Sequence, residues 1–239
     1  MNILTSKYSK SSAINLGEEL DCAVYNPYSH EFYRGSSLAD GISYNMGCSH
    51  VPFSNVINQP ASVYNCIDKT KTFDILEGAG VLICPWTRDK NIAQQWLDED
   101  KIVVNRATVT GSKNQGLSYS YKGVEGCEDV PLDEGSVIWT RYVNHTRELR
   151  AYVFKGKSPL VFEKVNIDGG WHFEPVRPTN KLLDQMKKAQ EAFSGLVFSA
   201  YDVLECVTGD FYTLENNSAP SLQVSDKIIP RLAEVLHEC

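Results

Sequence analysis

A predicted hairpin near the C-terminus constrains the fold of this chain more than any other sequence feature. Residues 198–203 and 211–214 are short apolar runs of the kind found in strands. Residues 208–210 (Thr-Gly-Asp) lie between them and favour a turn. We therefore expect the two runs to pair as antiparallel strands.

The hairpin would bring three oxygen-bearing side chains together. Asp202 and Glu215 can face the same side of the two strands, and Asn217, two residues beyond Glu215, returns to that side. Two carboxylates and an amide carbonyl are hard ligands that suit magnesium, which leaves its other positions to water and phosphate. An exposed hairpin with ordinary acidic residues would show the same pattern, and spacing alone leaves both interpretations open.

The rest of the chain mixes helix and strand patterns. Apolar residues spaced three and four apart predict helices, and short apolar runs predict strands. The predicted helices are 61–80, 90–97, 180–193 and 228–237, and the predicted strands are 81–84, 101–104, 137–140, 149–154 and 160–165, with a turn at 155–157. This mixture is typical of an α+β fold whose antiparallel sheets carry helices on one side.

The first 60 residues have a different composition, rich in Tyr, Asn, Ser and Gly. Two short apolar pieces, 13–16 and 22–25, stand between polar turns. We interpret them as strands of a small α/β lobe that precedes the main domain.

Composition excludes several classes of protein. The 239 residues are 42% hydrophobic, which is enough for a real core, and the net charge of -7 argues against a nucleic-acid or membrane-surface partner. No run of about 18 apolar residues exists, and the N-terminus has no apolar signal region. The seven cysteines have irregular spacing without a C-x-x-C pair, which favours reduced, mostly buried thiols and a cytoplasmic protein.

The C-terminal motif resembles a known signature. Asp202, followed by Glu215-x-Asn217 and then Ala219-Pro220, is similar to the D…LExNxxP signature of ATP-grasp enzymes. The resemblance implies that Asp202, Glu215 and Asn217 hold the Mg²⁺ that bridges the phosphates of ATP. Without that cation, the two carboxylates are expected to face each other in a strained site.

Two lysines resemble phosphate-binding residues of the same family. Asp68-Lys69, followed by Gly80 and Val81, is similar to the segment that opens many ATP-grasp domains, and its lysine contacts ATP phosphates. Lys164, at the end of a predicted strand, resembles a further phosphate-binding lysine.

A strand and a glycine-rich loop resemble the flap that closes over the triphosphate. The strand ends at Asn105 and Arg106, and the loop contains Gly111, Ser112 and Gly116. Glycine suits such a flap because backbone N–H groups must approach phosphates closely. The family's lysine at the end of the strand is missing, and Asn105 takes its place in the literal alignment. We prefer Arg106 as the source of the positive charge.

The next segments resemble the nucleotide-binding hinge and the strand that follows it. Backbone groups of Arg141, Tyr142 and Val143 would border the adenine, and Glu148 would hold a ribose hydroxyl or orient a lysine. Arg150 would contact the acyl phosphate, because a guanidinium group matches phosphate oxygens bidentately. A surface salt bridge between Glu148 and Arg150 is the alternative without the resemblance.

The resemblance covers residues 57–225 and is strongest to small phage and bacterial carboxylate–amine ligases. It implies a reduced N-terminal lobe at 1–56 and an ATP-grasp domain at 57–239, in which two α+β lobes with antiparallel sheets grip ATP. The implied activity is ATP- and Mg²⁺-dependent joining of a small-molecule or peptide carboxylate to an amine, through an acyl phosphate, in the cytoplasm (the host's cytoplasm for a viral protein).

Three other functions fit parts of the pattern. An ATP-grasp kinase-like or carboxylase-type enzyme would keep the fold without forming an amide. A catalytically silent nucleotide-binding or regulatory protein would explain the missing flap lysine, although all three metal ligands are present. A binding protein that takes no nucleotide would keep only the α+β architecture.

Overall fold

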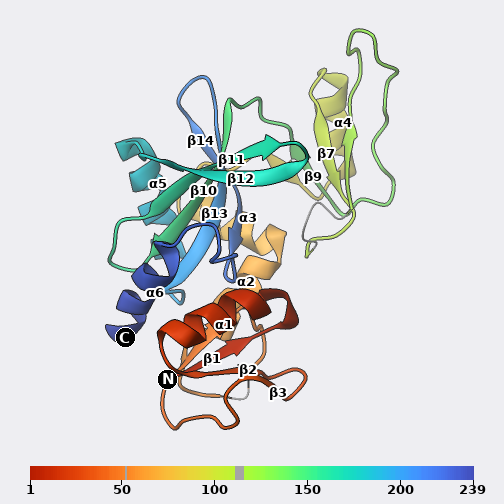
Figure 1. Ribbon diagram of the computed structural model, residues 1–239. Coiled ribbons are helices and arrows are strands. Elements are labelled where there is room, and N and C mark those ends of the chain that lie inside the picture. The colour runs from red at the N-terminus through yellow and green to blue at the C-terminus, as the bar shows by residue number, and fades with distance from the viewer. Residues whose placement is uncertain (52, 111–115) are drawn as a thin grey trace.

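The computed structural model describes residues 1–51, 53–110 and 116–239. Gly111 and Ser112 of the predicted flap lie outside the described residues. The described residues form three sheets, which we call the N-terminal, central and C-terminal sheets. Figure 1 shows the N-terminal sheet at the bottom, the C-terminal sheet above it and the central sheet with α4 at the upper right.

The N-terminal sheet has five strands in the order β3-β2-β1-β4-β5. Its strands are β1 (Asn2–Thr5), β2 (Ala23–Asn26), β3 (Glu31–Arg34), β4 (Ser43–Met46) and β5 (Val56–Ile57), with the short helix η1 (Lys7–Ser9) and helix α1 (Lys10–Glu19) after β1. β1 lies parallel to both β2 and β4, so the lobe is the predicted α/β type. The predicted boundary after residue 56 falls inside β5.

The prediction of a strand at 13–16 is wrong, because these residues belong to α1. Ala13 and Leu16 are both buried, and they lie one turn apart on the helix face that packs into the lobe. A four-residue apolar piece does not show its period, so strand and helix could not be separated. The strand at 22–25 is confirmed by β2.

The central sheet is antiparallel, in the order β6-β9-β7-β8. Its elements are β6 (Trp86–Thr87), α4 (Lys90–Asp98), β7 (Val103–Arg106), β8 (Leu117–Ser120) and β9 (Ile138–Arg141), preceded by α2 (Pro60–Ile67) and α3 (Lys69–Gly78). The helix expected at 61–80 is two helices, since Asp68 ends α2 and caps α3 by accepting hydrogen bonds from the N–H groups of Thr70 and Lys71. The strand expected at 81–84 is only an isolated bridge between Ile83 and Thr213.

The C-terminal sheet has the order β12-β11-β10-β13-β14 and is antiparallel throughout. Its elements are β10 (Arg147–Phe154), β11 (Leu160–Ile167), β12 (Gly170–Val176), α5 (Asn180–Ala192), β13 (Phe198–Glu205), β14 (Phe211–Asn217) and α6 (Ile228–His237). The hairpins, α5 and α6 are where the sequence predicts them. β12 was not predicted, because its exposed GWHFEPV sequence contains Gly, His and Pro and has no apolar run.

One face of the C-terminal sheet is apolar except at one end, where Arg147 forms ion pairs with Glu163 and Glu205. Leu149, Ala151 and Val153 on β10, with Tyr201 and Val203 on β13, point into a core shared with α2, α3 and α5. The period of two in these strands therefore leaves their intervening residues on the other face.

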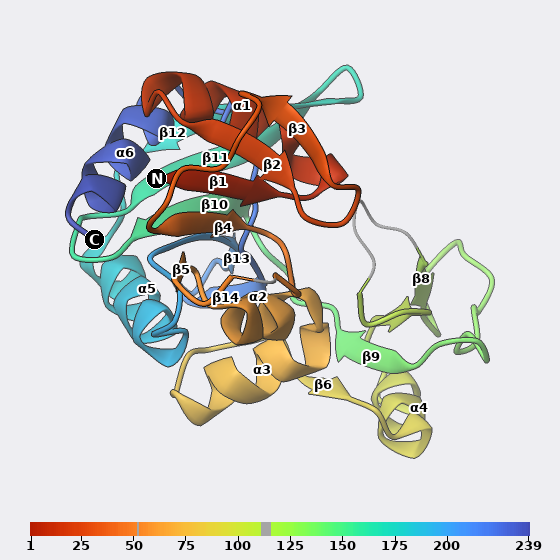
Figure 2. The ribbon, with the colours of Figure 1, turned by 90° about the horizontal axis from the view of Figure 1, so that it is seen from below.

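That second face is divided into two halves. Tyr152, Phe154, Phe198 and Ala200 pack against the N-terminal sheet, α1 and α6 in a second core. Figures 1 and 2 both show α1 and α6 side by side. Further along the same face the alternate residues become charged, and this half is where the predicted site residues lie.

Two further expectations concern cysteines and membranes. All seven cysteines are free, and most are buried, as predicted. Among residues 1–51, 53–110 and 116–239, no helix has both the length and the apolar character needed to cross a membrane.

Candidate active site

The three predicted metal ligands lie on the β13–β14 hairpin. Asp202 and Glu215 are direct partners across the two strands, and Asn217 is opposite Ala200. A bulge after Asp202 shifts the register, so that the residues beyond it pair as Val203 with Thr213. The side-chain oxygen of Asn217 accepts a hydrogen bond of 3.0 Å from the N–H of Ala219. Two carboxylates and one amide are thus placed along one face of the hairpin.

Each of the two carboxylates is paired with a cation from another element. Arg150 on β10 donates two hydrogen bonds to Asp202, with Nε–Oδ1 at 2.6 Å and Nη2–Oδ2 at 2.8 Å. Lys69, the first residue of α3, places its Nζ 2.8 Å from Oε2 of Glu215. The two carboxylates are direct partners across the strands, as expected, and neighbouring strands and a helix supply counter-charges that the hairpin alone could not reveal.

The Arg150–Asp202 pair is largely buried, and its charges stabilise each other. Burial acts to raise the pKa of Asp202, but the hydrogen bonds and charge of Arg150, and then the charge of Lys164, outweigh it and hold the pKa below its ordinary value. Burial likewise acts to lower the pKa of Arg150, and Asp202 more than offsets this and raises it. Both groups are therefore ionised at neutral pH.

Lys164 connects this pair to Glu148. Its Nζ lies 3.1 Å from Oε2 of Glu148 and 3.6 Å from Oδ2 of Asp202. Oε1 of Glu148 lies 3.7 Å from Nε2 of His145, whose Nδ1 is 2.9 Å from the carbonyl oxygen of Val143. His145 was not predicted as a site residue, because a lone histidine without a paired spacing carries no signal. Glu148 thus contacts a lysine, and its role in orienting that lysine stays a prediction.

Arg106 at the end of β7 also approaches this group. Burial lowers the pKa of Arg106 below its ordinary value, although the negative charge of Glu215 nearby opposes this shift. Its Nε is buried and has no hydrogen-bond partner in the described part of the chain. Asn105, in contrast, donates a hydrogen bond of 2.7 Å to Ser120 inside the central sheet. Of the two residues, Arg106 is the one that faces Glu215.

The predicted flap begins directly after Arg106. The N–H of Ala107 donates a hydrogen bond of 2.9 Å to the carbonyl of Gly116, which closes the base of the loop between β7 and β8. Gly116 has a φ of +68°, a left-handed conformation that favours glycine. The described ends of the loop therefore form a hairpin next to the charged group.

Arg141, Tyr142 and Val143 lie at the junction of the central and C-terminal sheets. They line a cavity of about 510 Å³, together with Ile102 and Tyr212. The N–H groups of Arg141 and Tyr142 already donate hydrogen bonds of 2.8 Å to carbonyl oxygens of neighbouring segments. A ligand in this cavity would therefore find these two N–H groups occupied, and Val143 is the better placed of the three to offer its own.

Two aromatic side chains of the unpredicted strand β12 also reach the site. The ring of Trp171 lies 5.0 Å from Nζ of Lys164, and the ring of Phe173 lies 5.6 Å from Cζ of Arg150. Rings at this distance attract cations through their electron-rich faces. No sequence signal marked these residues, because their role depends on a strand pairing that the pattern did not show.

The ion pair between Arg150 and Asp202 makes a testable contribution to stability. Asp202→Asn leaves the buried guanidinium without its carboxylate, and removing one partner of a buried pair costs about 3–5 kcal/mol. Because the pKa of Asp202 is lowered by folding, this contribution is complete above the unfolded-state pKa of about 3.9 and disappears as the pH falls through the lower folded-state pKa. The stability difference between wild type and variant should therefore narrow below about pH 4.

Urea unfolding between pH 7 and pH 3 measures this difference. The matched control is Asp21→Asn, which removes an exposed contact of 2.8 Å between Asp21 and Arg34 and should change stability much less. Equal effects of the two substitutions at pH 7 would contradict the importance of the buried pair.

Comparison with known proteins gives similarity at the level of the fold. The sequence matches no protein-family model and no curated protein. The fold is similar to that of the ATP-grasp ligase PsnB complexed with a minimal precursor, with 14% identity and a TM-score of 0.72 over 99% of this chain and 98% of that chain.

Two further solved structures have the same architecture. D-alanyl-alanine synthetase A from Vibrio cholerae has 14% identity and a TM-score of 0.70 over 100% of this chain and 97% of that chain. The macrocyclase MdnC bound with precursor peptide MdnA, from Microcystis aeruginosa, has 13% identity and a TM-score of 0.63 over 99% of both chains. The fold expected from the C-terminal motif is confirmed: this chain has the ATP-grasp fold.

Proposed function

We propose that this protein is an ATP- and magnesium-dependent ligase that joins a carboxylate to an amine through an acyl phosphate and releases ADP and phosphate. The observation that carries the proposal is the pairing of Asp202 with Glu215 on β13 and β14, each in contact with a cation from another element. A site that contains both carboxylates and cationic side chains suits a ligand such as Mg²⁺–ATP, in which a metal cation is bound to a polyanion.

The residues of the hairpin fit magnesium. Asp202, Glu215 and Asn217 supply oxygen ligands from one face, and magnesium is commonly held by one or two carboxylates together with phosphate and water. Among the described residues, no three histidine, cysteine, aspartate or glutamate side chains gather closely enough to hold a metal ion by themselves. When bound at the hairpin, the ion would neutralise charge on the transferring phosphoryl group.

The cations fit the triphosphate. Lys69, Arg106, Arg150 and Lys164 converge on the two carboxylates from α3, β7, β10 and β11. The buried Nε–H of Arg106 has no partner in the described part of the chain, so it has a free donor to offer a phosphate oxygen. Arg106 would then take the place of the flap lysine, whose absence favoured a silent nucleotide-binding protein.

The adenosine would occupy the cavity at the hinge. Arg141, Tyr142 and Val143 line it, and the chain from Val143 through His145 to Glu148 leads from the cavity to the charged group. Glu148 contacts both His145 and Lys164, so it is suited to hold a ribose hydroxyl while it orients that lysine.

The chemistry needs positioning rather than a protein nucleophile. An oxygen of the substrate carboxylate attacks the γ-phosphorus of ATP, the bond to the β-phosphate oxygen breaks, and ADP leaves. The amine nitrogen then attacks the acyl carbon, loses a proton and expels phosphate. Arg150 and Lys164 would neutralise the charge that develops on the transferred group, and Lys69 and Arg106 would hold the other phosphates.

The substrates we propose are small-molecule or peptide carboxylates and amines. PsnB and MdnC were solved with precursor peptides, and the Vibrio cholerae protein is a D-alanyl-alanine synthetase. We further propose the division into a lobe at 1–56 and an ATP-grasp domain at 57–239, and a cytoplasmic, phage-type ligase. An ATP-grasp kinase-like enzyme is the alternative outcome, in which phosphate is transferred without an amide being formed.

The first prediction is that Mg²⁺–ATP stabilises the protein. A ligand that binds only the native state adds about 2.7 kcal/mol at a hundredfold excess over its Kd. The melting temperature should therefore rise with millimolar ATP and Mg²⁺, and much less with ATP and EDTA. The absence of any rise with Mg²⁺–ATP would contradict the assignment of a nucleotide site.

The second prediction concerns turnover and Glu215. ADP release should require both a carboxylate and an amine from a panel of amino acids and short peptides. Glu215→Gln keeps the size of the side chain but removes a charge that holds the metal, so turnover should fall by about 100-fold or more. Glu163→Gln, on the opposite face of the same sheet, is the matched control and should keep full turnover. ADP release without any need for the amine would favour the kinase-like alternative.

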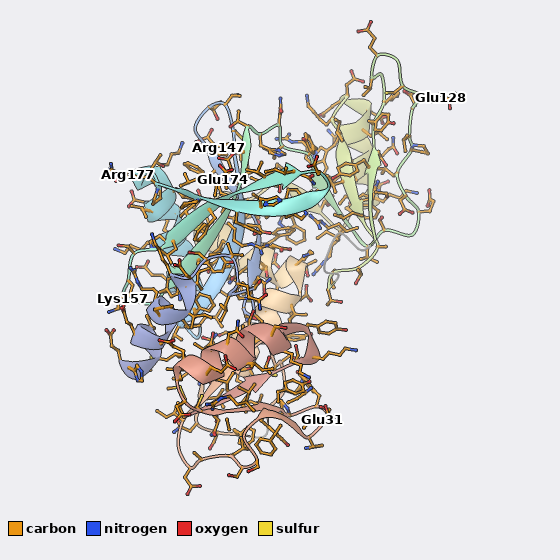
Figure 3. The ribbon with its side chains drawn as sticks, in the orientation of Figure 1. Glu31, Glu128, Arg147, Lys157, Glu174 and Arg177 are labelled. Carbon is orange, nitrogen blue, oxygen red and sulfur yellow. The ribbon has the colours of Figure 1, made fainter. Side chains whose placement is uncertain are left out.

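The third prediction tests Arg106 as the replacement for the flap lysine. Arg106→Ala should weaken Mg²⁺–ATP binding by about 10- to 100-fold, because hydrogen bonds to charged groups contribute about 1.5–3 kcal/mol. Arg106→Lys should restore only part of the affinity, since an ammonium group cannot form the planar fork. Titration calorimetry measures both, with Arg177→Ala, an exposed arginine that Figure 3 labels, as the control. Equal affinity of Arg106→Ala and wild type would place the role on another cation.

A further inference from the structure

Strand β12 places two aromatic side chains on the charged face of the C-terminal sheet. Phe173 is the direct partner of Lys164 on β11, and Trp171 is the partner of Asn166. Glu174, which Figure 3 labels on β12, is the partner of Glu163 and points to the other face. Trp171 and Phe173 therefore lie along the same face as Arg150 and Lys164, at the outer edge of the sheet.

The two rings contact the two cations that the proposed function assigns to the transferring phosphoryl group. Trp171 lies 5.0 Å from Nζ of Lys164, and Phe173 lies 5.6 Å from Cζ of Arg150. Trp171 is 50% exposed, so burial of a large side chain does not explain its place. Phe173 packs in addition against the core beneath the N-terminal lobe, which gives it a structural role of its own.

The other partners of these cations are carboxylates that are expected to change partners when ligands bind. Arg150 is held by Asp202, and Lys164 by Glu148 and Asp202. In the proposed function Asp202 coordinates magnesium and Glu148 holds the ribose, so both carboxylates share their oxygens with a ligand. The aromatic rings come from a different strand, and their contacts with the cations involve no carboxylate oxygen.

We propose that Trp171 is a positioning residue that holds Lys164 against the γ-phosphate of ATP once Asp202 and Glu148 are engaged by ligands. The inference rests on the proposed function and adds a residue on β12 to it. The ring acts through Lys164 and not on the nucleotide itself. Its effect is therefore expected on the phosphate that Lys164 contacts and not on the adenosine or the first two phosphates.

Binding of two nucleotides tests this positioning role without knowledge of the substrates. Titration calorimetry compares Mg²⁺–AMPPNP, a slowly hydrolysed ATP analogue, with Mg²⁺–ADP, which lacks the γ-phosphate. Trp171→Ala should weaken AMPPNP binding by about 2- to 5-fold, the range expected for an exposed cation–π contact, and leave ADP binding unchanged. Trp171→Phe, which keeps a ring, should recover part of the lost affinity.

A double-mutant cycle with Lys164→Ala isolates the contact. If the ring acts through the lysine, Trp171→Ala should have no further effect on AMPPNP binding in the Lys164→Ala background. Tyr8→Ala is the matched control, because it removes a contact of 5.1 Å with Lys7 on the N-terminal lobe and should change neither affinity. An unchanged melting temperature of Trp171→Ala without ligand would show that the fold is intact.

The outcomes separate the two proposals. If wild type binds both nucleotides and Trp171→Ala weakens neither, or weakens both equally, the positioning role of Trp171 is wrong and the nucleotide site stands. A full effect of Trp171→Ala in the Lys164→Ala background also overturns it, because the ring would then act without the lysine. If wild type binds neither nucleotide, the proposed function fails and the role of Trp171 fails with it.

Discussion

The ion pair between Arg150 and Asp202 lies where the apolar core beneath the N-terminal lobe meets the charged half of the C-terminal sheet. The two residues are direct partners on β10 and β13, two inner strands of the C-terminal sheet. The next positions on the same face, Tyr152 and Ala200, lie inside the core beneath the N-terminal lobe. A single charge so close to an apolar core would be costly, whereas a bidentate pair satisfies both groups. The pair therefore marks the border at which the C-terminal sheet changes from a docking surface into a site.

The charges around this border are arranged so that no carboxylate of the site is left alone. Glu215 has Lys69, Asp202 has Arg150, and Glu148 has Lys164. In a protein of net charge -7, this gathering of cations is local, and its members come from α3, β10 and β11. The proposed metal and triphosphate could replace these contacts with equivalent ones. Magnesium would replace the cation that now contacts each carboxylate, and a phosphate group would replace the carboxylate that now contacts each cation.

Part of the fold could be predicted from the sequence because it depends on local period and turns. The hairpin of β13 and β14, and helix α6 with its boundaries at Ile228 and His237, follow from apolar spacing. The strand expected at 13–16 is a helix, and it was not predicted as one because an apolar piece of four residues does not show whether its period is that of a strand or of a helix. β12 was not predicted, because an edge strand with one exposed face needs no apolar run. Local sequence signals thus predict helices and strands that have an apolar pattern of their own. They do not predict a strand that forms only because it pairs with a neighbouring strand.

The candidate site shows the same division. The shared face of Asp202 and Glu215 could be predicted, since alternation along a hairpin requires no knowledge of the rest of the chain. Their counter-ions could not, because Lys69 lies 146 positions from Glu215 and Arg150 lies 52 positions from Asp202. Only the completed sheet, with α3 placed against it, determines which cation meets which carboxylate.

The small N-terminal lobe is joined to the site by a close backbone contact. Gly47 follows β4 with a φ of +85°, and a Cβ built there would lie 2.6 Å from that of Ala219, just beyond Asn217. No larger residue fits, because both the conformation and the space require glycine. The carboxyl end of β4 is thereby held against the end of β14, and the carboxyl ends of parallel strands are where α/β sheets bind ligands. Five short strands are enough to hold this contact, since the lobe needs only to place the carboxyl ends of its strands next to the candidate site on the C-terminal sheet.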